Sequence, residues 1–223
     1  MNEQPPYVFR PSPWLGERAE LVFTAFVCAL EMPGDIAECG VYQGHTSHEF
    51  VKFLEKREID KTVHMFDSFE GFPDTLLPEE QALSRPGSDW ADLTPGAMAC
   101  SVDAVRHFMG SLSQYEIHKG FFSDTFLAFD KPLCFIHGDA DIYTSTVEII
   151  QFADRVLIPG GLMVIDDFEH PQFPGIKTAV YQYVHSTLYE IYPVDKHRQL
   201  FLIKRGGDPA LRPDVRFDIE DET

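Results

Sequence analysis

Two pairs of aspartates, Asp139 with Asp141 and Asp166 with Asp167, are spaced so that they could bind a metal ion. Residues two apart in an extended backbone point to the same side, and neighbouring strands lie about 4.8 Å apart. Carboxylates gathered in this way repel one another, and a hard divalent cation removes the repulsion. Oxygen ligands with open positions predict Mg²⁺, with Mn²⁺ or Ca²⁺ as alternatives. The simpler interpretation is turn chemistry, with Asp141 capping a helix that begins near Tyr143.

A second pattern, ECGVYQG over residues 38–44, has the form of a strand end, a turn and a helix start. Glycine lets the backbone turn tightly and approach a ligand, and the helix start offers unpaired N–H groups. Asp67 ends the next predicted strand, where a carboxylate can accept hydrogen bonds from ribose hydroxyls. The pattern therefore indicates a nucleoside cofactor, although an ordinary strand-to-helix turn can look the same.

The spacing of this turn differs from the dinucleotide pattern GxGxxG. An acid, Glu38, precedes the turn, and the bulky Tyr42 and Gln43 lie within it. Both features disfavour an anionic pyrophosphate, which needs several N–H donors from a glycine-rich loop. A cofactor with a cationic amino-acid part fits better, and this favours S-adenosylmethionine.

The elements that would position these residues alternate between strands and helices. Strands are predicted over residues 35–40, 62–67, 115–119, 133–137, 156–158, 162–165, 189–194 and 199–204, and helices over 17–31, 46–56, 101–112, 143–153 and 175–186. This order predicts an α/β fold with a Rossmann-like, doubly wound, mostly parallel sheet and an antiparallel closing strand. Ligands of such sheets bind beyond the carboxyl ends of the strands.

Composition limits the classes of protein that the chain could be. Its 223 residues suit a single domain over 1–223, with an N-terminal arm and helix over 1–33, a lid or insert over 70–97 and an acidic tail over 207–223. The 36 acids against 18 bases disfavour nucleic acid and anionic membranes as partners. Four cysteines without a CxxC pair suggest reduced thiols and a cytoplasmic location.

Several segments, taken in order, resemble the macrocin-O-methyltransferase (TylF/NovP-like) family. They lie at residues 33–44, 66–73, 119–125, 139–145, 159–168 and 174–179. The resemblance implies a fold of the class I methyltransferase type. It also implies S-adenosylmethionine and Mg²⁺ as cofactors and a sugar hydroxyl of a natural product as the acceptor.

The resemblance further implies roles for individual residues. Contacts to the cofactor are implied for Glu38, Gly40, Gly44, Asp67, Ser68, Phe69 and Asp124, with Asp67 at the ribose and Asp124 near the adenine. Metal ligation is implied for Asp139, Asp166 and Asp167, and the role of general base for Asp141.

These implications favour an O-methyltransferase that acts on a hydroxyl of a sugar or a glycosylated natural product, a small-molecule partner. One alternative is a phenol or catechol acceptor. Another is a non-catalytic S-adenosylmethionine-binding protein, and a third is a metal-dependent sugar-nucleotide enzyme, which the missing phosphate loop disfavours. The sequence leaves open whether the chain forms a homo-oligomer.

Overall fold

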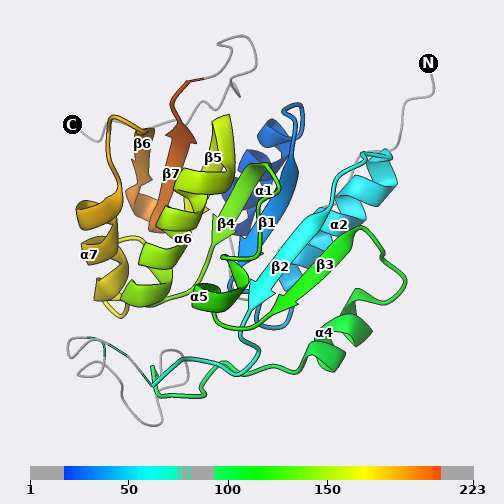
Figure 1. Cartoon of the computed structure of the whole chain (residues 1–223), viewed down its shortest axis with the longest axis horizontal. Helices are drawn as coiled ribbons and strands as arrows, with labels where there is room; N and C mark the ends of the chain where they lie inside the picture. The colour runs from blue at the N-terminus through cyan, green and yellow to red at the C-terminus, as the bar shows by residue number, and fades with distance from the viewer. Residues whose placement is uncertain (1–17, 75, 77–79, 81–92, 207–223) are drawn as a thin grey trace.

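A seven-stranded sheet forms the centre of the molecule (Figure 1). The computed structural model describes residues 18–74, 76, 80 and 93–206. The strands are β1 (Asp35–Cys39), β2 (Val63–Asp67), β3 (Tyr115–Lys119), β4 (Leu133–Gly138), β5 (Leu157–Ile165), β6 (Tyr189–Val194) and β7 (Gln199–Lys204). Their order is β3-β2-β1-β4-β5-β7-β6, and β7 runs antiparallel to both of its neighbours. The predicted doubly wound sheet with an antiparallel closing strand is confirmed.

Helices cover both faces of this sheet. They are α1 (Arg18–Ala29), α2 (His45–Arg57), α4 (Val102–Met109), α5 (Phe122–Thr125), α6 (Tyr143–Val156) and α7 (Pro174–Tyr183), with a short 3₁₀ turn η1 (Asp195–His197). Side chains of α1, α2 and α4 pack in one buried cluster, and those of α5, α6 and α7 pack in another. Figure 1 shows the two groups of helices on opposite sides of the strands.

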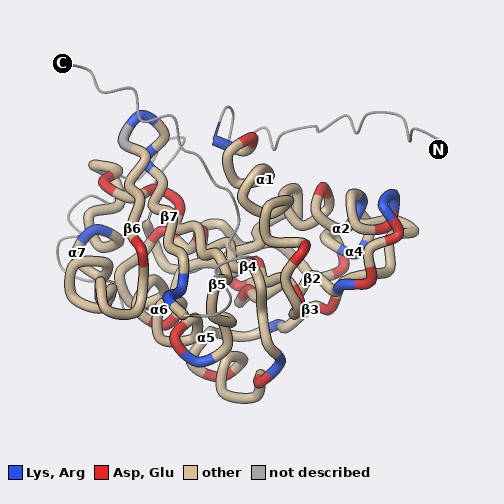
Figure 2. The backbone as a smooth tube through the Cα atoms, turned by 90° about the horizontal axis from the view of Figure 1, so that it is seen from above, with Lys and Arg blue, Asp and Glu red and all other residues tan. Residues whose placement is uncertain are grey.

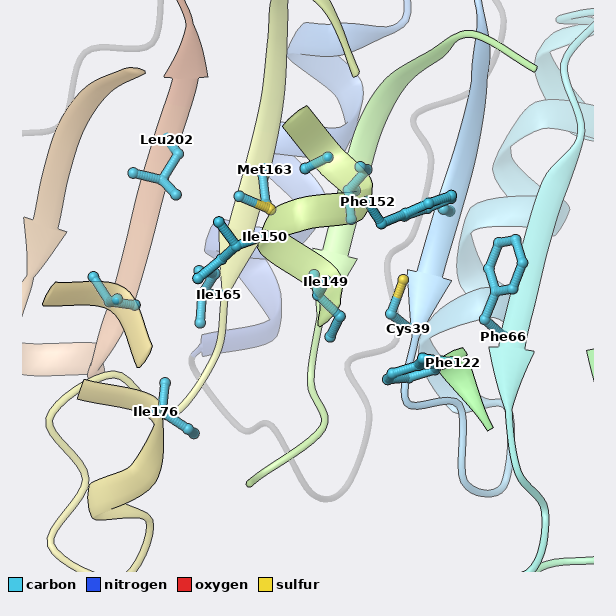
Figure 3. Close-up of a cluster of buried hydrophobic side chains, with 14 of the residues drawn as sticks. Cys39, Phe66, Phe122, Ile149, Ile150, Phe152, Met163, Ile165, Ile176 and Leu202 are labelled. Carbon is cyan, nitrogen blue, oxygen red and sulfur yellow. The ribbon is translucent and has the colours of Figure 1, made fainter. Parts of the chain in front are cut away.

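Successive side chains of each strand point to opposite faces of the sheet, so the core is divided between the two faces. Phe135 and Val164 belong to the cluster under α1 and α2, whereas Ile136 and Ile165 belong to the cluster under α6 and α7, drawn in Figure 3. Because both faces are buried, the central strands are continuously apolar rather than alternating between apolar and polar residues. This explains why β4 is buried over its whole length.

One local prediction was wrong, and one short element was missed. The expected pair of strands over 156–158 and 162–165 is a single strand, β5, interrupted by a bulge. Leu133 pairs with Leu157 and Phe135 with Leu162, so the extra residues around Pro159 loop out without ending the strand. The short helix α5 was not expected, because four residues are too few for a helical period to be recognised in the sequence.

The segment predicted as a lid or insert over 70–97 is described only at its two ends and at two inner positions. Phe72 N donates to Ala97 O over 3.0 Å, and Gly96 N donates to Phe72 O over 2.9 Å, so the two ends are joined. Leu76 and Leu93 are buried. The remainder of this segment, the arm before residue 18 and the acidic tail over 207–223 lie outside the described residues.

The structure shows the state of the cysteines and the distribution of the basic residues. All four cysteines are free, with Cys39 and Cys134 buried and Cys28 and Cys100 half-buried. Figure 2 shows Lys and Arg in short, scattered stretches of the described backbone. Among the helices in the described part of the chain, none has the length and apolar character needed to cross a membrane.

Candidate active site

A cavity of about 540 Å³ lies at the carboxyl ends of β1, β2 and β4. The chain runs outward from β1 to β2 and β3 and then returns to β4 beside β1, so this is the switch point where doubly wound sheets bind ligands. The volume falls in the range of small-molecule sites. Seven of the residues predicted to contact a cofactor or take part in chemistry line it together: Glu38, Gly40, Asp67, Ser68, Asp139, Asp141 and Asp167.

Gly40 is required where β1 and β4 come together. Its φ is +90°, and a Cβ at this position would lie 1.9 Å from the carbonyl oxygen of Asp139. Gly44 has φ of +83° and precedes the first residue of α2. The two glycines therefore let the chain leave β1 close to the acidic residues that follow β4 and enter the helix at once.

The carboxylate of Asp67 holds the turn after β1. Its Oδ2 accepts from the backbone N–H of Val41 at 2.7 Å and of Tyr42 at 2.9 Å, and its Oδ1 accepts from Phe69 N at 2.6 Å. Burial raises the pKa of Asp67 despite these bonds. Three of roughly four acceptor positions are thus occupied by the protein itself, which leaves room for one further hydrogen bond from a ligand.

Glu38 and His137 form a buried pair beneath the cavity. One oxygen of Glu38 accepts from both N and Oγ of Ser47 in the first turn of α2, and the other lies 3.2 Å from Nδ1 of His137 on β4. A neutral His137 that donates from Nδ1 presents the lone pair of Nε2 on the opposite side of the ring. One ring nitrogen of His137 lies within 4.8 Å of ligand oxygens of Asp139 and Asp166.

The four predicted carboxylates come together as one acidic cluster, defined by Asp139, Asp141, Asp166 and Asp167. Ligand oxygens of Asp139, Asp141 and Asp167 lie within 4.8 Å of one another. Burial and then repulsion from Asp166, Asp141 and Asp167 raise the pKa of Asp139 well above its usual value. Burial, followed by repulsion from Asp167 and Asp166, raises the pKa of Asp141 to about 8.

A cation from the chain itself partly neutralises the acidic cluster. Nη1 of Arg18, the first residue of α1, lies 2.5 Å from Oδ1 of Asp167 and 3.3 Å from Oδ1 of Asp166. Burial alone would lower the pKa of Arg18, but attraction to Asp166, Asp167 and Asp139 outweighs it and raises the pKa. One guanidinium against four carboxylates leaves the cluster short of positive charge.

The donor set fits a hard divalent cation. Within the described part of the chain, Oδ2 of Asp166 and Nε2 of His137 are buried and have no hydrogen-bond partner. Such unsatisfied buried atoms are rare, and here they face the gathered carboxylates. Oxygen atoms of Asp139, Asp166 and Asp167 are the ligands that Mg²⁺ prefers, and the adjoining cavity leaves positions for a substrate.

The remaining predicted residues lie around this cavity in different ways. Ser68 lines it, and its hydroxyl donates to Gly71 O over 3.0 Å. Gly44, Phe69 and Asp124 are not among the described residues that line the cavity. Phe69 is buried with the cluster under α2, and Asp124 is exposed on α5. Their predicted contacts with the cofactor stay predictions.

Two residues of this site were not expected from the sequence. Arg18 lies 148 residues from Asp166 along the chain, so no local motif marks it. His137 was not among the predicted site residues, yet one of its ring nitrogens lies within 4.8 Å of ligand oxygens of Asp139 and Asp166. Its position near the end of a buried strand, two residues before Asp139, is the signal that could have identified it.

Comparison with known proteins agrees with this geometry. The family model of macrocin-O-methyltransferase (TylF) matches residues 21–198. Mycinamicin III 3''-O-methyltransferase from Micromonospora griseorubida is 28% identical over 172 residues, which are 74% of this chain and 66% of that protein. Demethyldecarbamoylnovobiocin O-methyltransferase from Streptomyces niveus is 28% identical over 68% of this chain and 58% of its own length. The chain thus spans less than two thirds of these relatives.

Solved structures show the same fold. The O-methyltransferase NovP superposes with a TM-score of 0.73 at 23% identity, covering 85% of this chain and 80% of NovP. The calicheamicin methyltransferase CalS11 superposes with a TM-score of 0.67 at 18% identity, covering 88% of this chain and 81% of CalS11. The match of the family model over most of the sequence, together with the sheet order and the strand-end acidic residues, shows that the chain belongs to the macrocin-O-methyltransferase family.

Proposed function

We propose that this chain is an S-adenosylmethionine-dependent, Mg²⁺-dependent O-methyltransferase that acts on a sugar hydroxyl of a glycosylated natural product. The observation that carries the proposal is the shared cavity. Asp67 and Gly40, at the expected cofactor side, and Asp139 and Asp141, from the acidic cluster, line the same space. A methyl donor and a metal-bound acceptor could therefore meet within it.

The activities for which the relatives are named support a sugar acceptor. One is a mycinamicin III 3''-O-methyltransferase, and another methylates the 4' position of a rhamnosyl tetracenomycin. Membership of the same family makes a glycoside the acceptor of choice for this chain. The free cysteines agree with the proposed cytoplasmic location, where thiols stay reduced.

On the cofactor side, the chain supplies a turn and a carboxylate. Asp67 has one acceptor position left, which suits a ribose hydroxyl, and Ser68 lies next to it along the cavity wall. Gly40 removes any side chain from the strand end, and Glu38 contributes negative charge near the expected amino-acid part of the cofactor. Holding the two reactants in near-attack geometry can contribute roughly 7–11 kcal/mol to lowering the barrier.

On the acceptor side, Asp139, Asp166 and Asp167 would hold Mg²⁺, and His137 Nε2 lies behind them. When bound, S-adenosylmethionine supplies an electrophilic methyl group, and Mg²⁺ lowers the pKa of an acceptor hydroxyl. Asp141 is placed to take the hydroxyl proton. Burial and repulsion from Asp167 and Asp166 raise the pKa of Asp141 in the metal-free cluster, and a cation bound there would lower it again and favour the ionised carboxylate that a general base needs.

Apolar side chains complete the cavity. Phe72, Phe121, Phe122 and Phe173 line it beside the acidic residues. A glycoside has a polar sugar and, in many natural products, an apolar aglycone, and this mixed lining suits both parts. The apolar residues would exclude water from the reacting atoms while the aglycone contacts the rings.

Two measurements test the proposal. Calorimetric titration with S-adenosylhomocysteine, with and without Mg²⁺, should show binding, and a methyl-transfer screen over glycosides and catechols should show turnover of glycosides. Asp141→Asn should lose turnover, whereas the matched control Asp103→Asn, at an exposed acid of α4, should not. If S-adenosylhomocysteine does not bind, the cofactor is wrong. If only catechols are methylated, the acceptor class is wrong.

A further inference from the structure

A second group of metal-ligating side chains lies on β2 and β3, apart from the cavity. His64 pairs in register with Glu116, and His118 lies two residues further along the edge strand β3. Alternation places all three side chains on one face of the sheet, the face that α5 and α6 cover. None of these three described residues lines the cavity of the candidate active site.

The three ligand atoms converge on a single point. Nδ1 of His64 lies 3.1 Å from Nε2 of His118 and 3.3 Å from Oε2 of Glu116, and Nε2 of His118 lies 3.9 Å from the same oxygen. A tetrahedral ion with bonds of roughly 2.0–2.1 Å needs ligand atoms about 3.3 Å apart. The observed separations are close to that requirement without any movement of the backbone.

Asp35 orients one of these ligands from behind. Its Oδ2 lies 3.2 Å from Nε2 of His64, and its Oδ1 accepts from Thr62 N over 3.0 Å. A histidine that donates from Nε2 to a carboxylate carries its lone pair on Nδ1, which is the atom that faces His118 and Glu116. A carboxylate behind a ligating histidine is a common outer partner in metal sites.

The surroundings of the group are rigid on one side and open on the other. The His64 side chain is fully buried, with its ring 4.7 Å from that of Phe129, and the His118 ring stacks on Phe66 at 4.3 Å. The side chains of His118 and Glu116 are 25% and 50% exposed. An ion could therefore enter from solvent and complete its coordination with water.

One cation of the chain competes for this position. Lys131 Nζ lies 3.2 Å from Oε2 and 3.3 Å from Oε1 of Glu116. Its side chain is 47% exposed, so it can turn into solvent when an ion binds. The competition lowers the affinity of the group for a metal without removing any ligand.

We propose that His64 Nδ1, His118 Nε2 and a carboxylate oxygen of Glu116 bind a divalent transition-metal ion of the Zn²⁺ class and tie the edge strand β3 to β2. Two imidazoles and one carboxylate form a ligand set that suits Zn²⁺, Co²⁺ or Ni²⁺, whereas the four carboxylates of the acidic cluster suit Mg²⁺. The site is independent of the methyl-transfer reaction proposed above.

Titration with Co²⁺ in a large excess of Mg²⁺ tests the proposal, because nitrogen-ligated four-coordinate Co²⁺ has a strong visible absorption. Wild type should bind one Co²⁺ with such a spectrum, and Zn²⁺ should displace it and raise the melting temperature. Asp35→Asn should weaken Co²⁺ binding roughly 10- to 100-fold, because it removes the carboxylate that orients His64. His118→Gln and Glu116→Gln, each lacking a ligand, should weaken it further.

Two more variants separate a metal site from a hydrogen-bonded cluster. Lys131→Gln should bind Co²⁺ more tightly than wild type, because the competing cation is gone. His107→Gln, at an exposed histidine of α4, is the matched control and should bind like wild type. The proposal is wrong if wild type binds neither Co²⁺ nor Zn²⁺ or if His118→Gln binds as tightly as wild type. It is also wrong if Asp166→Asn/Asp167→Asn abolishes the only Co²⁺ signal.

Discussion

Asp67 shows how one side chain can serve both the fold and a ligand. Its carboxylate already accepts three backbone N–H groups from the turn after β1 and from Phe69. A variant at this position therefore loosens the turn as well as removing a contact with the cofactor. For this reason, the effect of a substitution must be measured on stability and on affinity together.

We predict that Asp67→Ala weakens binding of S-adenosylhomocysteine about ten- to hundredfold, because hydrogen bonds to charged groups contribute about 1.5–3 kcal/mol. Asp60→Ala, at an exposed acid between α2 and β2, should bind like wild type. Calorimetric titration measures both affinities, and circular dichroism at the same temperature verifies that each variant is folded. Unchanged affinity in folded Asp67→Ala would mean that the cofactor binds elsewhere.

Asp139 and Asp141 should be separable although they are neighbours. Asp139 lies directly after β4 and shares ligand geometry with Asp166, whereas Asp141 has a left-handed backbone, with φ of 63°, and lies further along the loop. We predict that Asp139→Asn weakens Mg²⁺ affinity and lowers turnover. Asp141→Asn should keep cofactor and Mg²⁺ affinity but lose about 10²–10⁴ in rate as the general base is removed.

Single-turnover kinetics, Mg²⁺ titration and cofactor titration on both variants decide between these roles. Equal loss of Mg²⁺ affinity in the two variants would place Asp141 among the metal ligands. A wild-type rate for Asp141→Asn would require a different base.

At the scale of the elements, the sequence predicts the parts that follow a simple period. Strand ends near Gly40 and Asp67 were located correctly because apolar runs stop at turn residues there. β5 was divided in two because Pro159 and two glycines look like a turn, and only pairing with β4 on both sides of them shows that they form a bulge. The preference of a residue for a strand or a turn is read from the local sequence, whereas a bulge is defined by the residues of the neighbouring strand with which it pairs.

The candidate site was predictable for a related reason. The carboxyl ends of parallel strands meet at one edge, so acids after β4 and β5 had to come close. Arg18 and Asp167, which are in contact, lie 149 residues apart along the chain, and neither local sequence predicts the contact. The contact forms because α1 packs against the sheet, and the position of α1 depends on how the whole core packs.

Arg18 couples the start of α1 to the acidic cluster, and this leads to a prediction for the helix. Because its guanidinium occupies the same carboxylate oxygens that a metal would need, Arg18→Gln should raise Mg²⁺ affinity about tenfold, equivalent to about 1.4 kcal/mol. In the absence of Mg²⁺ the same variant should melt at a lower temperature, since four carboxylates then lose their only protein cation among the described contacts.

Arg106→Gln is the matched control, because Arg106 makes one exposed pair with Asp103 on α4. Its Mg²⁺ affinity and melting temperature should equal those of wild type. Mg²⁺ titration followed by scanning calorimetry measures both quantities. A decrease of Mg²⁺ affinity in Arg18→Gln would show that Arg18 helps to hold the metal rather than competing with it.

At the scale of the whole molecule, repulsion between negative charges lowers the stability of the folded state, and bound cations reduce this repulsion. The chain has a formal charge of −18, and in its acidic cluster Asp166 and Asp167 are buried while Asp139 and Asp141 are half-buried. A folded state with uncompensated buried carboxylates is less stable than its apolar core alone would allow. Stability should therefore respond to any cation that binds the folded state alone.

We predict that Mg²⁺ raises the melting temperature of the protein after EDTA treatment and dialysis. A ligand at one hundred times its Kd adds about 2.7 kcal/mol, which corresponds to roughly 5–10 °C for a chain of this size. Asp166→Asn/Asp167→Asn should lose this response, whereas Asp60→Asn/Asp103→Asn, at exposed acids, should retain it. These variants test the acidic cluster directly.

Because EDTA also removes transition metals, the titration is repeated in His118→Gln, where the proposed site on β2 and β3 is absent. If the rise in melting temperature with Mg²⁺ persists in His118→Gln and disappears in the Asp166/Asp167 variant, the acidic cluster is the Mg²⁺ site. No response in wild type at millimolar Mg²⁺ would make the cluster structural, with Arg18 as its counter-ion.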